Sequence, residues 1–110
     1  MIVTQPDRVL LQQQLKQFGP LLTGALLDVG SGRSRRYAWA LPNVTGYTTI
    51  DPDPRGKPDI VGSAEAIPLP DASFESVLCT QVLEHVAHPQ KVMSEIARVL
   101  KPGGRCLLTV

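Results

Sequence analysis

Residues 26–39 read LLDVGSGRSRRYAW, and this stretch decides the fold class. The short apolar run at residues 25–29 is bounded by glycines, as is typical of a buried strand in a parallel sheet. Gly30, Ser31 and Gly32 follow at once, and residues without a side chain let a ligand approach the backbone closely. Ligands bind outside the carboxyl ends of the strands in such sheets. We therefore expect a strand that ends in a ligand-binding turn.

Strands and helices alternate along the rest of the chain. Further strands are expected at residues 46–51, 59–62, 76–80 and 105–110. Helical segments are expected at residues 7–18, with Asp7 as N-cap, and at 33–40, 64–67, 81–86 and 89–100. Gly103 and Gly104 are expected to form a turn. This alternation predicts an α/β fold with a parallel sheet of about five strands and flanking helices.

Composition places the chain among ordinary soluble domains. Its 110 residues are 43% hydrophobic and 19% charged, and the net charge is +1, which favours neither a nucleic-acid nor a membrane partner. We expect one domain, 1–110, with an N-terminal helix in 1–20 and a core at 25–110. No signal peptide or spanning segment is apparent, so a cytoplasmic location is expected. Cys79 and Cys106 lie in apolar runs and indicate buried thiols rather than a disulfide.

Polar or small residues follow each predicted strand. Asp51 ends the second strand, 21 residues after Gly30, and a carboxylate there suits a ribose diol. Ser63 and Ala64 follow the third strand, and Thr80 ends the fourth. These strand ends are expected to surround a single cleft.

Two kinds of nucleotide compete for the glycine loop. The dinucleotide fingerprint requires a third glycine for close helix–strand packing, and Arg35 stands at that position. Asp28 lies two residues before Gly30, where a carboxylate would repel a pyrophosphate but attract an ammonium or sulfonium group. The loop therefore favours S-adenosylmethionine over a dinucleotide.

Four motifs in order carry a family resemblance over most of the chain. They are LLDVGSG (26–32), TTIDPDP (48–54), DIVGSAEAIPLPDASFESVLCTQVLEHV (59–86) and EIARVLKPGGRCLLTV (95–110). The sequence resembles class I, Rossmann-like S-adenosylmethionine-dependent methyltransferases of the small-molecule subgroup. The resemblance implies strand order 3-2-1-4-5, S-adenosylmethionine as cofactor and a small-molecule methyl acceptor.

The resemblance also implies roles for the strand-end residues. Asp28, Gly30, Ser31 and Gly32 would surround the methionine part of the donor, and Asp51 would bind the ribose. The adenine side would be formed by Pro52, Ser63 and Ala64, with Thr80 at the fourth strand end. No metal ligands and no catalytic base are assigned. Glu84, His85 and His88 lie near the expected acceptor entrance, but capping or packing explains them equally well, and Arg33 is a candidate partner for the donor carboxylate.

The chain departs from the family pattern at Ser34 (often glycine), Ser63 (usually aspartate) and Glu75 (usually aspartate). It also stops after the fifth strand, without the family's C-terminal antiparallel pair. The strand at 105–110 would then be an exposed edge, which predicts a homodimer or swapped assembly through it, or else a piece of a longer protein. The alternative is a monomer with the N-terminal helix over the edge. Two other functions stay open: a truncated or degenerate cofactor-binding module without activity, and an NAD-dependent oxidoreductase. The arginines at 33, 35 and 36 are expected to be a solvated face.

Overall fold

The computed structural model describes residues 2–3, 8–32 and 35–110, and the predicted N-cap Asp7 lies outside them. The described residues form one six-stranded sheet in the order β1-β6-β5-β2-β3-β4, with every neighbouring pair parallel. The strands are β1 (Ile2–Val3), β2 (Gly24–Val29), β3 (Val44–Asp51), β4 (Ile60–Val61), β5 (Phe74–Thr80) and β6 (Leu100–Thr109). The five predicted strands are β2 to β6, so their predicted order 3-2-1-4-5 is confirmed.

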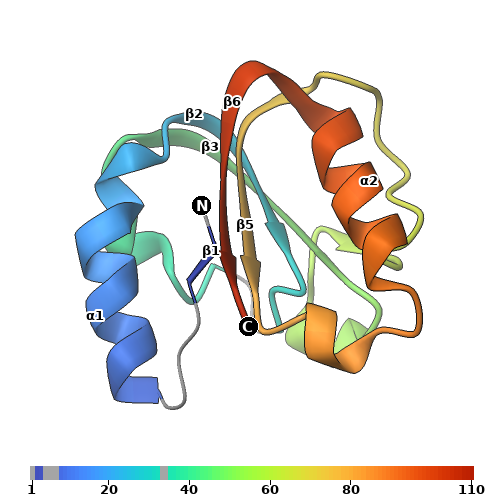
Figure 1. The fold of residues 1–110 in the computed structure, drawn as a ribbon, viewed down its shortest axis with the longest axis horizontal. Coiled ribbons are helices and arrows are strands. Elements are labelled where there is room, and N and C mark those ends of the chain that lie inside the picture. The colour runs from blue at the N-terminus through green and yellow to red at the C-terminus, as the bar shows by residue number, and fades with distance from the viewer. Residues whose placement is uncertain (1, 4–7, 33–34) are drawn as a thin grey trace.

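Two α-helices cover opposite faces of the sheet (Figure 1). The helix α1 (Arg8–Phe18) ends where Gly19 and Pro20 begin a 3-10 turn, as the sequence predicts. The helix α2 (Pro89–Val99) has proline in its first turn, where the missing N–H costs nothing. Shorter 3-10 helices are η1 (Gly19–Leu21), η2 (Ala38–Ala40), η3 (Pro54–Gly56) and η4 (Leu83–His85).

The central strands are buried on both faces because a helix packs on each. Leu11 and Leu15 of α1 pack with Leu26, Leu78 and Leu107 of the sheet. On the other face, apolar residues of α2 form a cluster with residues of the strands. That cluster includes Leu27, Val29, Ile50, Val77, Cys79, Val92, Ile96, Val99 and Leu108. Burying each large aliphatic side chain contributes about 1.5–3 kcal/mol, so these two clusters fix the sheet.

The short helix predicted at 33–40 is wrong for most of its length. Residues 35–37 form a turn and only Ala38–Ala40 form a 3-10 helix, while residues 33–34 lie outside the described residues. Arg35 has a φ of 57°, which is incompatible with a right-handed helix. The left-handed backbone at this residue therefore interrupts the helix.

The turn predicted at Gly103 and Gly104 is also wrong, because both residues lie within β6. This strand starts at Leu100, before the predicted 105–110. Its register against β5 shifts between the pairs Phe74 with Leu100 and Ser76 with Arg105. Residues 101–104 of β6 therefore lie opposite a single residue of β5 and form an irregularity in the strand. Gly103, within this irregularity, has a φ of 80°.

The outer edge of β6 is not bare along its whole length. Ile2 and Val3 of β1 pair in parallel with Leu108 and Thr109, so a strand, and not the N-terminal helix, lies against this end of the edge. On its other side β6 pairs with β5 at Leu100 and from Arg105 to Thr109. The homodimer through β6 stays a prediction.

Candidate functional site

A cleft of about 230 Å³ lies at the carboxyl ends of the strands. It brings together five predicted residues that are far apart in the sequence. They are Gly30, Asp51, Pro52, Ser63 and Ala64. Ile50, Gly62, Gln81, Val82, His85 and Val86 complete its lining. The predicted convergence of the strand ends is therefore correct for these five residues.

Asp51 ties the glycine loop to the end of β3. Its Oδ2 accepts a hydrogen bond from the Gly32 N–H at 2.9 Å, and its Oδ1 accepts one from the Asp53 N–H at 2.8 Å. Each carboxylate oxygen can accept a second hydrogen bond. Asp51 therefore keeps one acceptor position per oxygen for a pair of hydroxyl donors.

Gly30 owes its identity to packing as well as to the turn. Its φ is 70°, a backbone conformation that residues with a side chain rarely adopt. A Cβ atom added at Gly30 would also overlap Cγ2 of Val82. The space expected to admit a ligand is therefore filled by Val82 at this glycine. Gly32, with a φ of 60°, would place a Cβ in ordinary contact with the Arg36 guanidinium, so it is the more open of the two.

Asp28 is a carboxylate buried within the sheet. Its side chain is 0% exposed, its Oδ2 accepts a hydrogen bond from the Tyr47 hydroxyl at 2.7 Å, and its Oδ1 has no partner. Burial raises the pKa of Asp28 to about 7, although the Tyr47 hydrogen bond and the Arg36 charge oppose the rise. Asp28 does not line the cleft itself but lies two residues before Gly30, which does, and an ionisable group with an unpartnered oxygen at this place is suited to a cationic ligand.

Three buried hydroxyls extend this polar region across the sheet. Ser31, Thr80 and Thr109 each bury a hydroxyl oxygen that has no hydrogen-bond partner. Thr80 and Thr109 are paired neighbours at the ends of β5 and β6, on the same face as Asp28 and α1. Unsatisfied buried polar atoms are rare in folded proteins, and a cluster at strand ends indicates a place where a ligand completes the hydrogen bonding.

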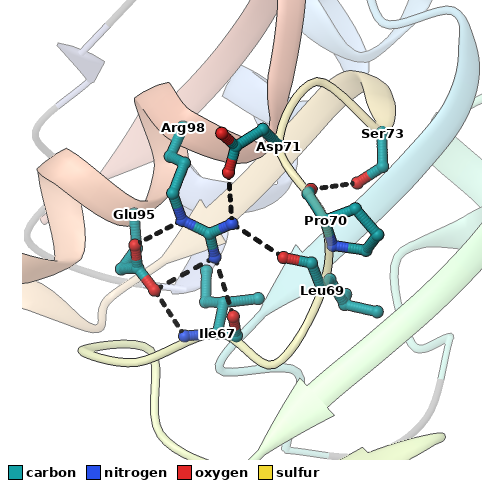
Figure 2. A network of polar contacts seen from close by, with 7 residues as sticks. All are labelled: Ile67, Leu69, Pro70, Asp71, Ser73, Glu95 and Arg98. Carbon is teal, nitrogen blue, oxygen red and sulfur yellow. Dashed lines mark hydrogen bonds and ion pairs between the residues drawn. The ribbon is translucent and has the colours of Figure 1, made fainter.

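Arg98 of α2 is the centre of a polar network that holds the loop at residues 67–71 (Figure 2). Its guanidinium donates hydrogen bonds to the Ile67 and Leu69 carbonyls at 2.8 Å each. It also pairs with Glu95 at 2.7 Å and Asp71 at 2.8 Å, and these hydrogen bonds raise the pKa of Arg98. This loop follows Ser63 and Ala64 in the chain, so Arg98 holds the segment that leads away from this side of the cleft.

Ser63 and Pro52 are exposed at the rim of the cleft, whereas Ala64 is buried. The Ser63 Oγ accepts a hydrogen bond from the Glu65 N–H at 3.0 Å, which closes a local turn. The hydroxyl keeps its own proton and a second lone pair for a ligand. Serine can therefore make the contact for which the family usually has aspartate, but without charge.

The sequence places Gln81 directly after the fourth strand and His85 near the expected acceptor entrance, and both line the cleft. Gln81 has a left-handed φ of 54° and its N–H donates to the Thr109 carbonyl at 2.9 Å. Such backbone strain in a non-glycine residue is frequent at functional sites. His85 lines the rim with its side chain 77% exposed, 3.8 Å from Glu84. The signal available in the sequence was their place directly after the fourth strand.

Other predicted features lie away from the cleft. Within the described residues Cys79 and Cys106 form no disulfide, and burial raises the pKa of Cys106 to about 11. Arg35 and Arg36 are exposed, with the Arg36 guanidinium 4.6 Å from the centre of the Tyr37 ring. The candidate carboxylate partner Arg33 and the departure at Ser34 lie outside the described residues.

Neither a metal centre nor a membrane span is found in the described ranges. Their His, Cys, Asp and Glu side chains form no group of three suited to a metal ion. Their helices include none with the length and apolar character that crossing a membrane requires.

The strand order and the cleft match a known family. The family described as "Methyltransferase domain" matches residues 27–108, which is most of the chain. The match includes the glycine loop, Asp51 and Arg98 of α2. This chain belongs to the methyltransferase domain family. The matched segment begins within β2, contains β3, β4 and β5 and ends near the end of β6, so the family assignment and the Rossmann-like fold rest on largely the same residues.

Relatives of this methyltransferase domain share the fold but are longer. An uncharacterized methyltransferase of Mycobacterium bovis is 35% identical over 103 residues, covering 82% of this chain and 40% of the relative. The crystal structure of YcgJ from Bacillus subtilis matches with a TM-score of 0.67 and 28% identity, over 88% of this chain and 48% of YcgJ. The cyclase SpnF matches with a TM-score of 0.68 and 27% identity, over 86% of this chain and 42% of SpnF. The chain thus spans less than half the length of these proteins.

Proposed function

We propose that this domain binds S-adenosylmethionine in the strand-end cleft and transfers its methyl group to a small-molecule acceptor. The observation that carries the proposal is the meeting of Asp51 and the glycine loop at the cleft, with the buried Asp28 two residues before Gly30. Membership of the methyltransferase domain family supports the same reaction.

The residues at the cleft fit the parts of this cofactor. Asp51 has acceptor positions for the two ribose hydroxyls, and the apolar Ile50, Ala64 and Val82 suit the adenine ring. The amino-acid part carries an ammonium group, which the open Oδ1 of Asp28 would pair with. The buried hydroxyls of Ser31 and Thr80 provide further polar contacts for this part.

The chain has a modest chemical task in the proposed reaction. The bound cofactor would supply a methyl group already activated by its sulfonium. The protein must hold donor and acceptor in line and exclude water, and alignment of this kind supplies much of the rate enhancement. The hydrogen bonds of Arg98 hold the loop that follows Ala64, and the hydrogen bond from Gly32 to Asp51 holds the glycine loop against the end of β3.

His85 is placed to assist an acceptor that must lose a proton. It belongs to η4, lines the cleft together with Asp51, and has an exposed side chain. A neutral imidazole in reach of an acceptor hydroxyl would act as general base. We propose this role for acceptors that bind as alcohols or phenols.

Binding of S-adenosylhomocysteine tests the cofactor site directly. At 100 times its Kd, a ligand that binds only the folded state adds about 2.7 kcal/mol, a rise of several degrees in Tm for a domain of this size. NAD is the control compound and is expected to leave Tm unchanged. Asp51→Ala should lose the shift, whereas Asp53→Ala, which removes an exposed carboxylate two residues away, should keep it.

Each outcome identifies one of the three candidate functions. A Tm rise with S-adenosylhomocysteine alone supports the proposal and justifies a screen of methyl acceptors. A rise with NAD alone would point to an oxidoreductase. No rise with either compound would refute the proposed function and leave a domain that keeps the fold without the ligand.

A further inference from the structure

The buried carboxylate of Asp28 on β2 accepts a hydrogen bond at 2.7 Å from the Tyr47 hydroxyl on the neighbouring strand β3. The second oxygen of this carboxylate, Oδ1, has no hydrogen-bond partner. The pair is not a product of sequence proximity, because the two residues lie on β2 and β3, 19 positions apart. Leu26 is the register partner of Tyr47, so the tyrosine reaches along β2 from Leu26 to Asp28 on the α1 face.

The contact determines how the carboxylate is presented. With Oδ2 occupied by the Tyr47 hydroxyl, the orientation of the Asp28 group is fixed and Oδ1 is the oxygen left for a ligand. A hydrogen bond to an ionised acceptor also favours the charged form. The same hydroxyl therefore orients Asp28 and opposes the effect of burial on its charge.

We propose that Tyr47 is a positioning residue that orients Asp28 and keeps it ionised for the ammonium group of the bound donor. The inference rests on the proposed function, since it concerns the same site. It makes donor binding depend on pH, because the cation pairs only with the ionised carboxylate.

The groups that act on Asp28 set the direction of this dependence. Tyr47 and Arg36 lower the pKa of Asp28, and burial and Asp51 raise it to about 7. Cys79 on β5 also interacts with Asp28 electrostatically, from the opposite face of the sheet. Without the Tyr47 hydroxyl, the pKa of Asp28 should rise, and donor binding should need a higher pH.

The test is calorimetric titration of Tyr47→Phe with S-adenosylhomocysteine between pH 6 and pH 8.5. A one-unit rise in the pKa of Asp28 would lower its ionised fraction at pH 7 about fivefold but change it little at pH 8.5. Affinity should therefore fall most at the lower pH. Methylthioadenosine, which lacks the amino-acid part, should bind both proteins with equal affinity at every pH.

Tyr37→Phe is the matched control variant. Tyr37 packs against the same apolar cluster as Tyr47 and also loses one hydroxyl, so a general packing effect would appear in both variants. A pH profile for Tyr47→Phe that matches wild type or Tyr37→Phe would overturn the inference while leaving the proposed function intact. Failure of the wild type to bind S-adenosylhomocysteine would overturn both.

A measurement on the wild type keeps the inference testable if Tyr47→Phe does not fold. Binding of S-adenosylhomocysteine at pH 7 should release about half a proton from Asp28, since the group is near half-ionised when free. Titrations in buffers of different ionisation enthalpy measure this release. Methylthioadenosine should release none, and equal release by both ligands would refute the assignment of Asp28 to the ammonium group.

Discussion

The burial of Asp28 predicts that a single isosteric substitution changes how the stability of the domain depends on pH. The pKa of this carboxyl is about 7 in the folded state against an ordinary 3.8, and its side chain is 0% exposed. Between these two values the folded state holds a proton that the unfolded state has lost, so wild-type stability falls as pH rises. Above pH 7 the ionised, buried group should cost on the order of 4 kcal/mol.

Asp28→Asn removes the ionisation and keeps an oxygen that accepts from Tyr47. The buried amide nitrogen adds a cost of about 1–3 kcal/mol that does not depend on pH. The prediction therefore concerns how the difference in the free energy of unfolding between the variant and wild type changes with pH. This difference should shift in favour of the variant by about 3 kcal/mol between pH 4.5 and pH 8.5. Most of the gain should fall below pH 7.

Urea unfolding at pH 4.5, 6, 7 and 8.5 measures this difference, because the midpoints and slopes give a free energy of unfolding at each pH. Asp71→Asn, which removes one negative charge from an exposed side chain, controls for net charge. A difference between Asp28→Asn and wild type that is constant across the four pH values would refute the reasoning. The variant should also lose S-adenosylhomocysteine binding, which would show that the strained carboxylate is kept for function.

Three further substitutions test the packing around the site. Gly30→Ala should destabilise the fold by at least about 1–2 kcal/mol, because of its positive φ and the overlap with Val82, and urea unfolding would show it. Arg98→Lys cannot reach both loop carbonyls and should speed amide exchange at Ile67 more than at the β5 amides. Ile96→Val in the core should cost about 0.5–1.5 kcal/mol in the same unfolding assay without changing exchange at the loop.

Several features of this domain could be predicted from the sequence because they depend on local chemistry. Apolar runs bounded by glycines indicate buried strands, and the parallel sheet brings their carboxyl ends to one edge. Gly30, Asp51, Ser63 and Ala64 could be assigned to one cleft on that basis, and they do line it together. Their position after a strand was sufficient, with no knowledge of side-chain directions.

The helix expected at 33–40 failed because local spacing does not reveal a left-handed residue such as Arg35. The strand at Ile2–Val3 could not be predicted either, since two residues carry no periodicity and pair with β6 more than 100 positions away. Contacts of this kind depend on the whole chain being folded.

The sequence by itself determined the alternation of strands and helices and the residues at the strand ends, because each follows from patterns a few residues long. Its four motifs carry the family resemblance, and that resemblance implied the strand order. Only the tertiary structure decided that Tyr47 hydrogen-bonds to Asp28, that Val82 fills the space at Gly30 and that Arg98 hydrogen-bonds to the loop after Ala64. Each of these contacts joins side chains of different elements. Their geometry follows from strand register and helix placement, which the packing of the two apolar clusters sets.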